Sequence, residues 1–310
     1  HRYRDPSRPW AVYAMDWKVS EEGESHGGSG KSVAFKSIRY FMKDVTLNGR
    51  DPDLTGNKHI YENVSNHTDY ILIDDCNQYL KFDFFFAPLT GELTVNPKNN
   101  KQFTIPFEDV PKFALTSNFS LRNIDPSTER RLLYCVFSDY YHFNGDDTYK
   151  ESRSPRDEFG KNLFKDFNEE EWNLFINFMA QCLQFYMRFE KIEPPMENVT
   201  KRNLQTIMGM TFMHWADVYF SEESGNLDKL IEKSVALKTY TDENKTSWTT
   251  HKFTHALKAW VKYRGYNLNP ADFQNKGGRI IRKNASQKAV EMIYIQTKPE
   301  LAEEENTHAF

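Results

Sequence analysis

Three glycines surround a serine and precede a lysine and a second serine in the segment ESHGGSGKS, residues 24–32. Glycine allows backbone dihedrals that turn several N–H groups toward one anion. A lysine can reach the outer phosphates of a triphosphate, and a hydroxyl can be a ligand of Mg²⁺. The segment therefore predicts a phosphate-binding loop that leads into a helix. The residues expected to contact the nucleotide are Ser25, His26, Gly27, Gly28, Ser29, Gly30, Lys31 and Ser32.

An apolar segment that ends in two carboxylates, YILIDD at residues 70–75, lies roughly forty residues after the loop. It predicts a buried strand, after which Asp74 and Ser32 hold Mg²⁺ and Asp75 polarises the attacking water. The alternative is an edge strand that enters a turn. Because the loop and the acidic segment occur together, the sequence favours a nucleoside triphosphatase with ATP and Mg²⁺ as cofactors.

A second apolar segment, FALTSN at residues 113–118, ends in an amide. In a parallel sheet this strand would lie beside the acidic strand. Asn118 would then orient the attacking water or sense the γ-phosphate, because an amide both donates and accepts hydrogen bonds.

Two arginines, Arg130 and Arg131, stand directly before the apolar segment that begins at Leu132. They are either structural, bonded to a nearby carboxylate, or they supply an arginine finger to the nucleotide of a neighbouring subunit. The second role requires a ring or another oligomer.

Residues 92–105 read as strand, polar turn and strand, which predicts a hairpin. Lys98 and Lys101 lie at its tip and are candidates for gripping a single-stranded DNA backbone. An ordinary surface hairpin is an equally good interpretation of the same residues.

The chain divides into three parts by composition, at 1–147, 148–235 and 236–310. The first alternates short apolar runs with helix-like stretches, as α/β folds do. The second is predicted to be helical, with a capping box from Asn168 to Glu171 before a helix.

The third part is strongly basic and ends in a short acidic tail. Between Lys245 and Lys288 there is one acid, Asp272, against ten basic residues: Lys245, Lys252, Lys258, Lys262, Arg264, Lys276, Arg279, Arg282, Lys283 and Lys288. A helix from Thr249 or Thr250 to about Arg264, followed by two strands, predicts a winged-helix-like domain. The expected DNA contacts there are Lys276, Arg279, Arg282 and Lys283. The alternative is a solvated basic face on a small packing domain.

The bulk composition is that of a soluble protein, with 39% hydrophobic and 27% charged residues among 310. The three cysteines lie far apart, which favours a reduced setting, and no apolar run is long enough to span a membrane. We therefore expect an intracellular protein. Because the sequence begins at His1 rather than Met, we also expect further residues upstream.

Taken together, these parts resemble the superfamily 3 helicases, which are AAA+-type ring motors of small viruses, phages and plasmid-like elements. More narrowly, the chain is similar to the helicase half of phage or mobile-element primase-helicases. The motifs that carry the resemblance lie within residues 20–140, and the later part matches in architecture alone. The expected fold is an AAA+-like α/β P-loop NTPase with a central parallel sheet, then a helical region and the winged-helix-like domain.

The resemblance implies a role for each motif. The family's first motif falls on Gly27 to Ser32, its acids on Asp74 and Asp75, and its polar sensor on Asn118. Its DNA-gripping hairpin falls on the loop around Lys98 to Lys101, and its arginine finger on Arg131, or on Arg130 if the register differs by one.

As a whole protein, the resemblance implies an ATP-driven DNA helicase or translocase that acts in replication. It would be hexameric, would act on single-stranded or forked DNA, and would often carry a primase domain upstream. The same resemblance implies the cytoplasm of a bacterial or phage-infected cell. One alternative is an ATPase that serves as a switch or assembly factor without unwinding. A small-molecule kinase and a non-catalytic DNA-binding module fit less well, because the basic residues lie at the far end and the loop is paired with acids.

Overall fold

The structure is a computed structural model that describes residues 4–17, 28–121, 124–142, 151–189, 196–275 (196–198 by their backbone alone), 277–284 and 286–297. Contacts group the chain into two compact units, His1–Val199 and Thr200–Phe310. These units differ from the three parts expected from composition. The expected boundary after residue 235 falls inside helix α8, Lys233–Glu243, within the second unit.

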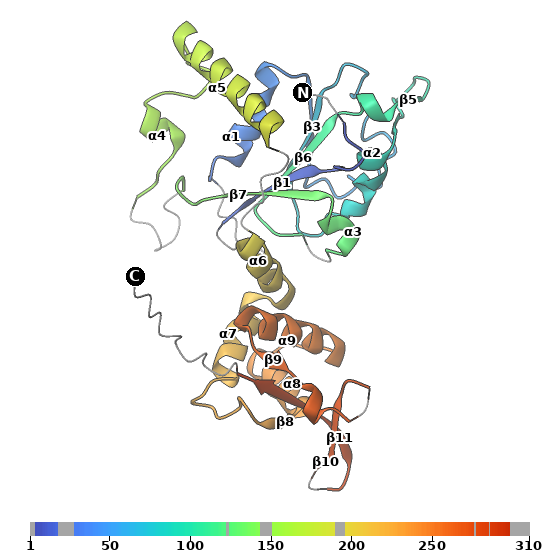
Figure 1. The fold of residues 1–310 in the computed structure, drawn as a ribbon, viewed down its shortest axis with the longest axis vertical. Helices are drawn as coiled ribbons and strands as arrows, with labels where there is room; N and C mark the ends of the chain where they lie inside the picture. The colour runs from blue at the N-terminus through green and yellow to red at the C-terminus, as the bar shows by residue number, and fades with distance from the viewer. Residues whose placement is uncertain are drawn as a thin grey trace, which may run out of the picture. The chain divides into compact units, whose positions relative to one another are not determined.

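A five-stranded sheet forms the centre of the first unit (Figure 1). Its strand order is β2-β3-β6-β1-β7, and every neighbouring pair is parallel. The strands are β1 (Ala11–Asp16), β2 (Asp44–Asn48), β3 (Tyr70–Cys76), β6 (Lys112–Ser117) and β7 (Leu132–Phe137). A central parallel sheet with flanking helices is compatible with the predicted α/β P-loop-like fold.

Alternation along the strands assigns side chains to two buried faces. Tyr70 and Leu72 of β3 lie in one cluster, against Phe35 of helix α1 and Ile38 of the 3₁₀ turn η1. Ile71 and Ile73 of β3 lie in a second cluster, together with buried side chains of η2 and α2. These elements are α1 (Lys31–Lys36), η1 (Ser37–Tyr40), η2 (Phe82–Phe85) and α2 (Phe86–Thr90). Both faces are therefore covered, as a parallel sheet requires.

The register of the sheet brings three strand ends together. Met15 of β1 and Cys76 of β3 are both paired with Ser117 of β6. The predicted neighbourhood of the acidic strand and the Asn118 strand is confirmed. Residues that follow these strands therefore meet at one edge of the sheet.

Gly49, just after β2, lies against the end of β3. Its N–H donates to the Asp74 carbonyl at 2.7 Å, and an added Cβ would lie 2.7 Å from the backbone N and Cα of Cys76. We expect Gly49→Ala to destabilise the first unit by about 1–3 kcal/mol, because backbone atoms must move to admit the methyl group. Urea unfolding followed by circular dichroism checks this. Gly56→Ala is the control, since its Cβ would meet its nearest neighbour at 3.8 Å, and an equal loss in both variants would contradict the explanation.

The remaining elements of the first unit include the predicted hairpin and the predicted capped helix. The hairpin is β4 (Leu93–Val95) paired with β5 (Phe103–Ile105). Asn168 accepts from the Glu171 N–H and donates its own N–H to the Glu171 carboxylate, each at 2.9 Å, so the capping box is confirmed. The helices here are α3 (Pro126–Glu129), α4 (Pro155–Phe159) and α5 (Glu169–Arg188), with the 3₁₀ turn η3 (Phe107–Asp109). Helix α6 (Met196–Met208) begins in the first unit, and its residues from Thr200 onward belong to the second.

The second unit gathers the later part of α6, further helices and a small antiparallel sheet around one core. Its core is aromatic and includes Phe212, Trp215, Tyr240, Phe253 and Trp260. The helix predicted from Thr249 or Thr250 is confirmed as α9, which Thr249 caps. In chain order the elements are α7 (Met210–Tyr219), β8 (Leu230–Glu232), α8, α9 (Thr250–Arg264), β9 (Asn267–Leu268), the 3₁₀ turn η4 (Ala271–Phe273), β10 (Ile280–Lys283) and β11 (Ala289–Gln296).

In that sheet β11 lies between β10 and β8, and β9 pairs with the end of β11. The two strands predicted to follow the helix are therefore confirmed as β10 and β11, which pair as a hairpin. Among the helices of the described residues, none has both the length and the apolar character that crossing a membrane would require.

Candidate functional site

The loop before α1 depends on two glycines with positive φ. Gly28 has a φ of 112° and Gly30 a φ of 90°, and both values lie in the region that L side chains rarely adopt. Gly30 is also the residue from which α1 starts. Of the predicted loop residues, Ser25, His26 and Gly27 lie outside the described part of the chain.

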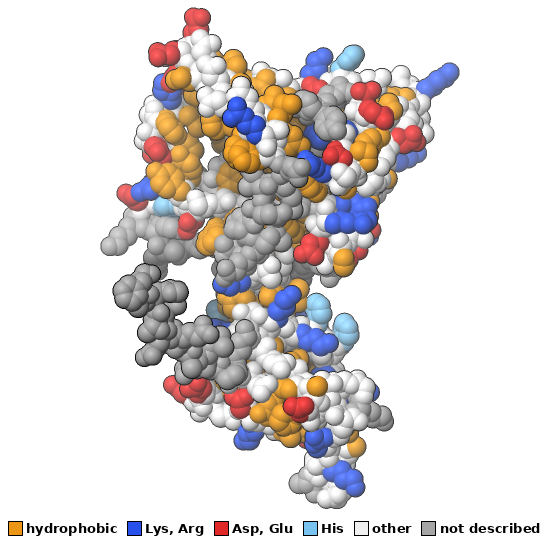
Figure 2. All heavy atoms as spheres, in the orientation of Figure 1, with side chains coloured by type: hydrophobic (Ala, Val, Ile, Leu, Met, Phe, Trp, Pro, Cys, Tyr) orange, Lys and Arg blue, Asp and Glu red, His pale blue; other side chains and the backbone are white. Residues whose placement is uncertain are grey.

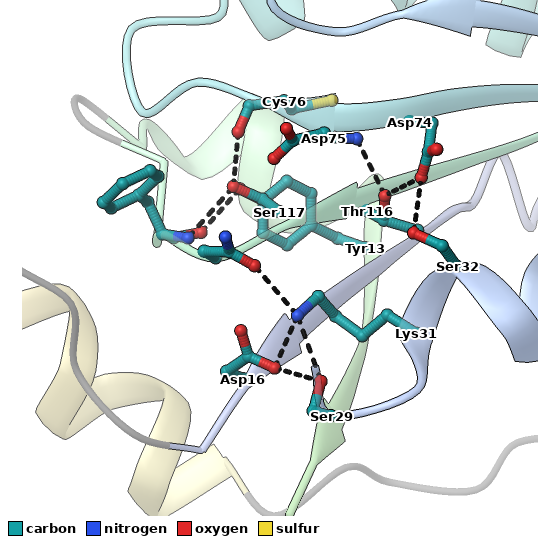
Figure 3. Close-up of polar contacts among 12 residues, drawn as sticks. Tyr13, Asp16, Ser29, Lys31, Ser32, Asp74, Asp75, Cys76, Thr116 and Ser117 are labelled. Atoms are coloured by element: carbon teal, nitrogen blue, oxygen red, sulfur yellow. Dashed lines mark hydrogen bonds and ion pairs between the residues drawn. The ribbon is translucent and has the colours of Figure 1, made fainter. Parts of the chain in front are cut away.

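Lys31 is buried at the start of α1 and contacts three polar side chains (Figure 3). Its Nζ lies 2.5 Å from Oδ1 of Asp16, 3.0 Å from Oδ1 of Asn118 and 3.1 Å from Oγ of Ser29. Ser29 also donates to Asp16. Asp16 ends β1 and is 3% exposed, and its Oδ2 is buried without a hydrogen-bond partner among the described residues. The lysine is thus held by a carboxylate that the sequence analysis did not predict.

Ser32 and Asp74 meet as predicted, and two further side chains join them. Oδ1 of Asp74 accepts from the hydroxyls of Ser32 at 2.9 Å and Thr116 at 2.7 Å, while Lys36 Nζ lies 2.6 Å from Oδ2. Burial by itself raises the pKa of Asp74, but the hydrogen bonds from Lys36, Thr116 and Ser32 outweigh this and lower it. The carboxylate is therefore held in its charged form.

Asp75 points to a different partner. Its backbone N–H donates to the Thr116 hydroxyl at 2.9 Å, and its φ is 60°. Its carboxylate makes a two-pronged contact with Arg50, at 2.5 Å from Nε and 3.1 Å from Nη2. The hydrogen bond that Arg50 donates to Asp75 raises the pKa of Arg50. Both side chains are about half exposed, at 46% and 50%, so the pair lies at the rim of the site.

A cavity of about 470 Å³ unites these groups. Its lining joins the described part of the loop to the ends of β3 and β6 and to the start of α4. The lining residues are Gly28, Ser29, Gly30, Lys31, Ser32, Val33, Asp74, Asp75, Thr116, Ser117, Asn118, Ser154 and Pro155. The predicted residues that the structure describes here, from Gly28 to Ser32 together with Asp74, Asp75 and Asn118, thus line one polar hollow.

The two arginines before β7 differ in exposure. Arg131 is 8% exposed, lies over the Phe86 ring at 4.2 Å and donates to the Ser127 carbonyl at 2.8 Å. Arg130 is exposed at the end of α3. An arginine finger must reach a neighbouring subunit, so Arg131, the first choice from the sequence, is not placed for that role in this structure. Of the two arginines, Arg130 is therefore the better candidate for the finger, because its side chain is exposed.

The lysines of the predicted DNA-gripping hairpin are exposed at its tip, between β4 and β5. Lys98 lies 3.7 Å from Glu62 with 64% of its side chain exposed, and Lys101 is exposed as well. The position fits either of the interpretations that the sequence left open.

The predicted DNA contacts of the second unit lie around the β10–β11 hairpin. Arg279 and Lys283 are exposed. Arg282 is half-buried and donates to the carbonyls of Ile281 at 3.0 Å and Phe273 at 3.1 Å, which gives it a structural role. Lys276 lies outside the described residues.

One face of α9 carries a row of histidine and lysine side chains that the prediction did not single out. His251, His255, Lys258 and Lys262 recur at helical spacing and are exposed. The two imidazole rings are nearly parallel, with centroids 6.5 Å apart. Figure 2 shows histidine and basic side chains gathered over this helix.

Four residues that contact the predicted site went unpredicted: Asp16, Lys36, Arg50 and Thr116. Asp16 carried a usable signal, since it follows the apolar run of β1 just as Asp74 follows the apolar run of β3. Thr116 also lies two residues before Asn118, in the apolar segment from which Asn118 was predicted. Lys36 and Arg50 had no signal, because their contacts depend on how α1 and the end of β2 lie against β3.

Comparison with known proteins assigns the chain to no family. No family model matches the chain, and no curated protein matches it. Among solved structures, the apo A form of the C-terminal region of NrS-1 is similar at a TM-score of 0.35 and 12% identity. A second structure of that region, given as residues 305–718, has the same TM-score at 10% identity. Each match covers 93% of this chain and 67% of the other. The functional proposal therefore rests on the geometry of the site.

Proposed function

We propose that the first unit is a Mg²⁺-dependent nucleoside triphosphatase, and that the chain uses ATP to move along DNA. The observation that carries the proposal is the convergence of Lys31, Ser32, Asp74 and Asn118 on one cavity. They come from a glycine loop and from the ends of two adjacent parallel strands, which is where open α/β sheets bind ligands. Cation, hydroxyl, carboxylate and amide are also the groups that a metal-bound triphosphate requires.

The residues fit a magnesium ion that is shared with phosphate. Ser32 and Thr116 place their hydroxyl oxygens 2.9 Å and 2.7 Å from Oδ1 of Asp74, and all three are hard oxygen ligands. No cluster of three or more His, Cys, Asp or Glu side chains suited to a metal ion occurs among the described residues. That agrees with Mg²⁺, which commonly uses one or two protein carboxylates together with substrate phosphates and water. When bound, the ion would neutralise charge on the β- and γ-phosphates. Ser32 and Asp74 would hold it.

Hydrolysis joins a water oxygen to the γ-phosphorus and breaks the bond to the bridging oxygen. Lys31 would leave Asp16 for the phosphate oxygens, and Asn118 would orient the water or the γ-phosphate. Asp75 would polarise the water and accept its proton, while the diphosphate leaves with the electron pair of the broken bond. To do so, Asp75 must first part from Arg50, which now occupies both of its oxygens.

Asp16 provides a separate prediction. Its carboxylate stabilises the nucleotide-free state by pairing with Lys31, but its negative charge would repel a phosphate that binds Lys31. We expect Asp16→Asn to destabilise the empty protein by about 3 kcal/mol, because Lys31 becomes a buried charge without its counter-ion. We also expect ATP to bind more tightly. Urea unfolding and calorimetric titration check both effects, and weaker ATP binding by the variant would contradict this role.

DNA binding is supported by the order of elements in the second unit. Helices α8 and α9 follow one another as in a helix-turn-helix, and the β10–β11 hairpin would form the wing. Lys258 and Lys262 on α9, together with the exposed Arg279 and Lys283, offer cations to phosphates. In the first unit, Lys98 and Lys101 would grip a single strand within a ring of subunits, and Arg130 would reach the nucleotide of the next subunit.

The second candidate is an ATPase switch or assembly factor that does not unwind DNA. The Arg50–Asp75 and Lys31–Asp16 pairs favour it, since both hold the proposed catalytic groups away from a substrate. A switch would hydrolyse ATP only after such pairs open.

Two assays on the full chain test the proposal and separate the candidates. We expect Mg²⁺-dependent release of phosphate from ATP that single-stranded DNA stimulates, and displacement of one strand from a forked duplex. Lys31→Ala is the control and should lose both activities. Hydrolysis without displacement would favour the switch, and absence of hydrolysis by the intact chain would contradict the proposal.

A further inference from the structure

A second cavity, of about 700 Å³, adjoins the 470 Å³ cavity of the candidate site, which we call the first cavity. The two share Ser29, Gly30, Val33 and Pro155 as lining residues. The rest of its wall comes from α1, from β7 and the residues after it, and from the α4–α5 region. A ligand whose charged part lies in the first cavity can therefore extend into the second without leaving the protein surface.

The second cavity is apolar and aromatic. The rings in its wall belong to Phe35, Phe137, Tyr140, Tyr141, Phe164, Phe175 and Phe178. Two of its apolar side chains remain strongly exposed, Phe178 at 60% and Val33 at 43%. Figure 2 shows hydrophobic side chains gathered over α5 and beside it. An exposed apolar hollow of this size is typical of a site for a small flat ligand.

We propose that this cavity holds the base of the nucleotide and that it accepts adenine and guanine alike. The proposal rests on the proposed function, because the shared wall links the cavity to the phosphate loop. Aromatic side chains stack on any base, since every base has a π-face. The exposed ring of Phe178 provides such a face.

The tolerance follows from which polar groups line the cavity. Its lining as described contains no carboxylate, amide or basic side chain. The hydroxyls there belong to Ser29, Ser37, Ser138, Tyr140 and Tyr141.

Several of these hydroxyls already have protein partners. Ser29 donates to Asp16, Ser37 to the Ala34 carbonyl, and Tyr141 to Glu158. A hydroxyl also both donates and accepts, so it does not separate the amino group of adenine from the keto group of guanine. Strong selection between bases requires buried polar groups that the wrong base leaves unpaired, and the described lining lacks them.

Hydrolysis kinetics of the full chain with ATP and GTP test the inference. We expect the two values of kcat/KM to agree within about tenfold, since apolar packing discriminates weakly. Rejection of GTP by a factor of about 10³ or more would overturn it and would leave the triphosphatase proposal intact.

Binding measurements on a cavity variant, with nucleotides and with a triphosphate that has no base, test where the base lies. Phe178→Ala should weaken binding of ATP and GTP by roughly tenfold and leave binding of inorganic tripolyphosphate unchanged. Phe185→Ala, on the same helix outside the cavity and 45% exposed, is the control and should change neither. Unchanged ATP binding in Phe178→Ala would overturn the assignment. If the intact chain binds neither ATP nor tripolyphosphate, the proposed function itself fails.

Discussion

Replacing Arg130 with alanine is expected to lower the rate of ATP hydrolysis on the order of 10³-fold, with binding of ATP unchanged. The side chain is exposed at the end of α3. It would therefore stabilise charge on the nucleotide of a neighbouring subunit rather than on its own. A guanidinium suits this role because it is always charged and offers several donors. Steady-state hydrolysis in the presence of single-stranded DNA measures the effect.

Arg131→Ala is the matched control. Its guanidinium lies over Phe86 and bonds the Ser127 carbonyl, so we expect loss of stability with hydrolysis per folded molecule retained. Mixing provides a stricter test. The Arg130→Ala and Lys31→Ala chains, each inactive alone, should recover activity together, because some interfaces would pair an intact Lys31 with an intact Arg130. Full turnover by Arg130→Ala, or no recovery on mixing, would refute the finger in trans.

Replacing Asp75 with asparagine is expected to lower kcat by about 10²–10⁴-fold. The amide keeps the shape of the side chain but cannot accept the proton of the attacking water. Binding of ATP should change little, since Asp74 and Ser32 rather than Asp75 would hold the metal. Single-turnover hydrolysis and a separate binding titration distinguish the two effects.

Arg50→Ala tests the same carboxylate from the other side. If the contact with Arg50 holds Asp75 away from water, its loss should raise hydrolysis in the absence of DNA. A fall in hydrolysis to the level of Asp75→Asn would instead mean that Arg50 positions the carboxylate for the reaction.

The core of the site was predictable from sequence because parallel strands end at a shared edge. Asp74 and Asn118 each follow an apolar run, so the type of sheet fixes where they meet. The same reasoning applies to Asp16, which follows the apolar run of β1. The choice between Arg130 and Arg131 was not predictable. Neighbouring side chains point in different directions, so a shift of one residue in where the strand begins would exchange the exposed and the buried arginine.

Long-range packing accounts for what the sequence did not predict. The contacts of Arg50 with Asp75 and of Lys36 with Asp74 depend on tertiary placement, which no local pattern encodes. In the second unit, α9 and the hairpin were predicted from periodicity and turn residues. The contacts place no boundary between units at residue 235, where composition predicted one. The reason is that Phe212 and Trp215 of α7 pack against aromatic rings of α8 and α9. Composition cannot reveal such packing.

Titration calorimetry of ATP into the full chain, with Mg²⁺ and with EDTA, tests the central claim most directly. The account predicts one site per chain that is clearly tighter with Mg²⁺, and a smaller difference between the two conditions in Ser32→Ala and Asp74→Asn. It also predicts loss of binding in Lys31→Ala. Binding that is equally tight in EDTA and unchanged in these three variants, or no binding by the intact chain, would contradict it.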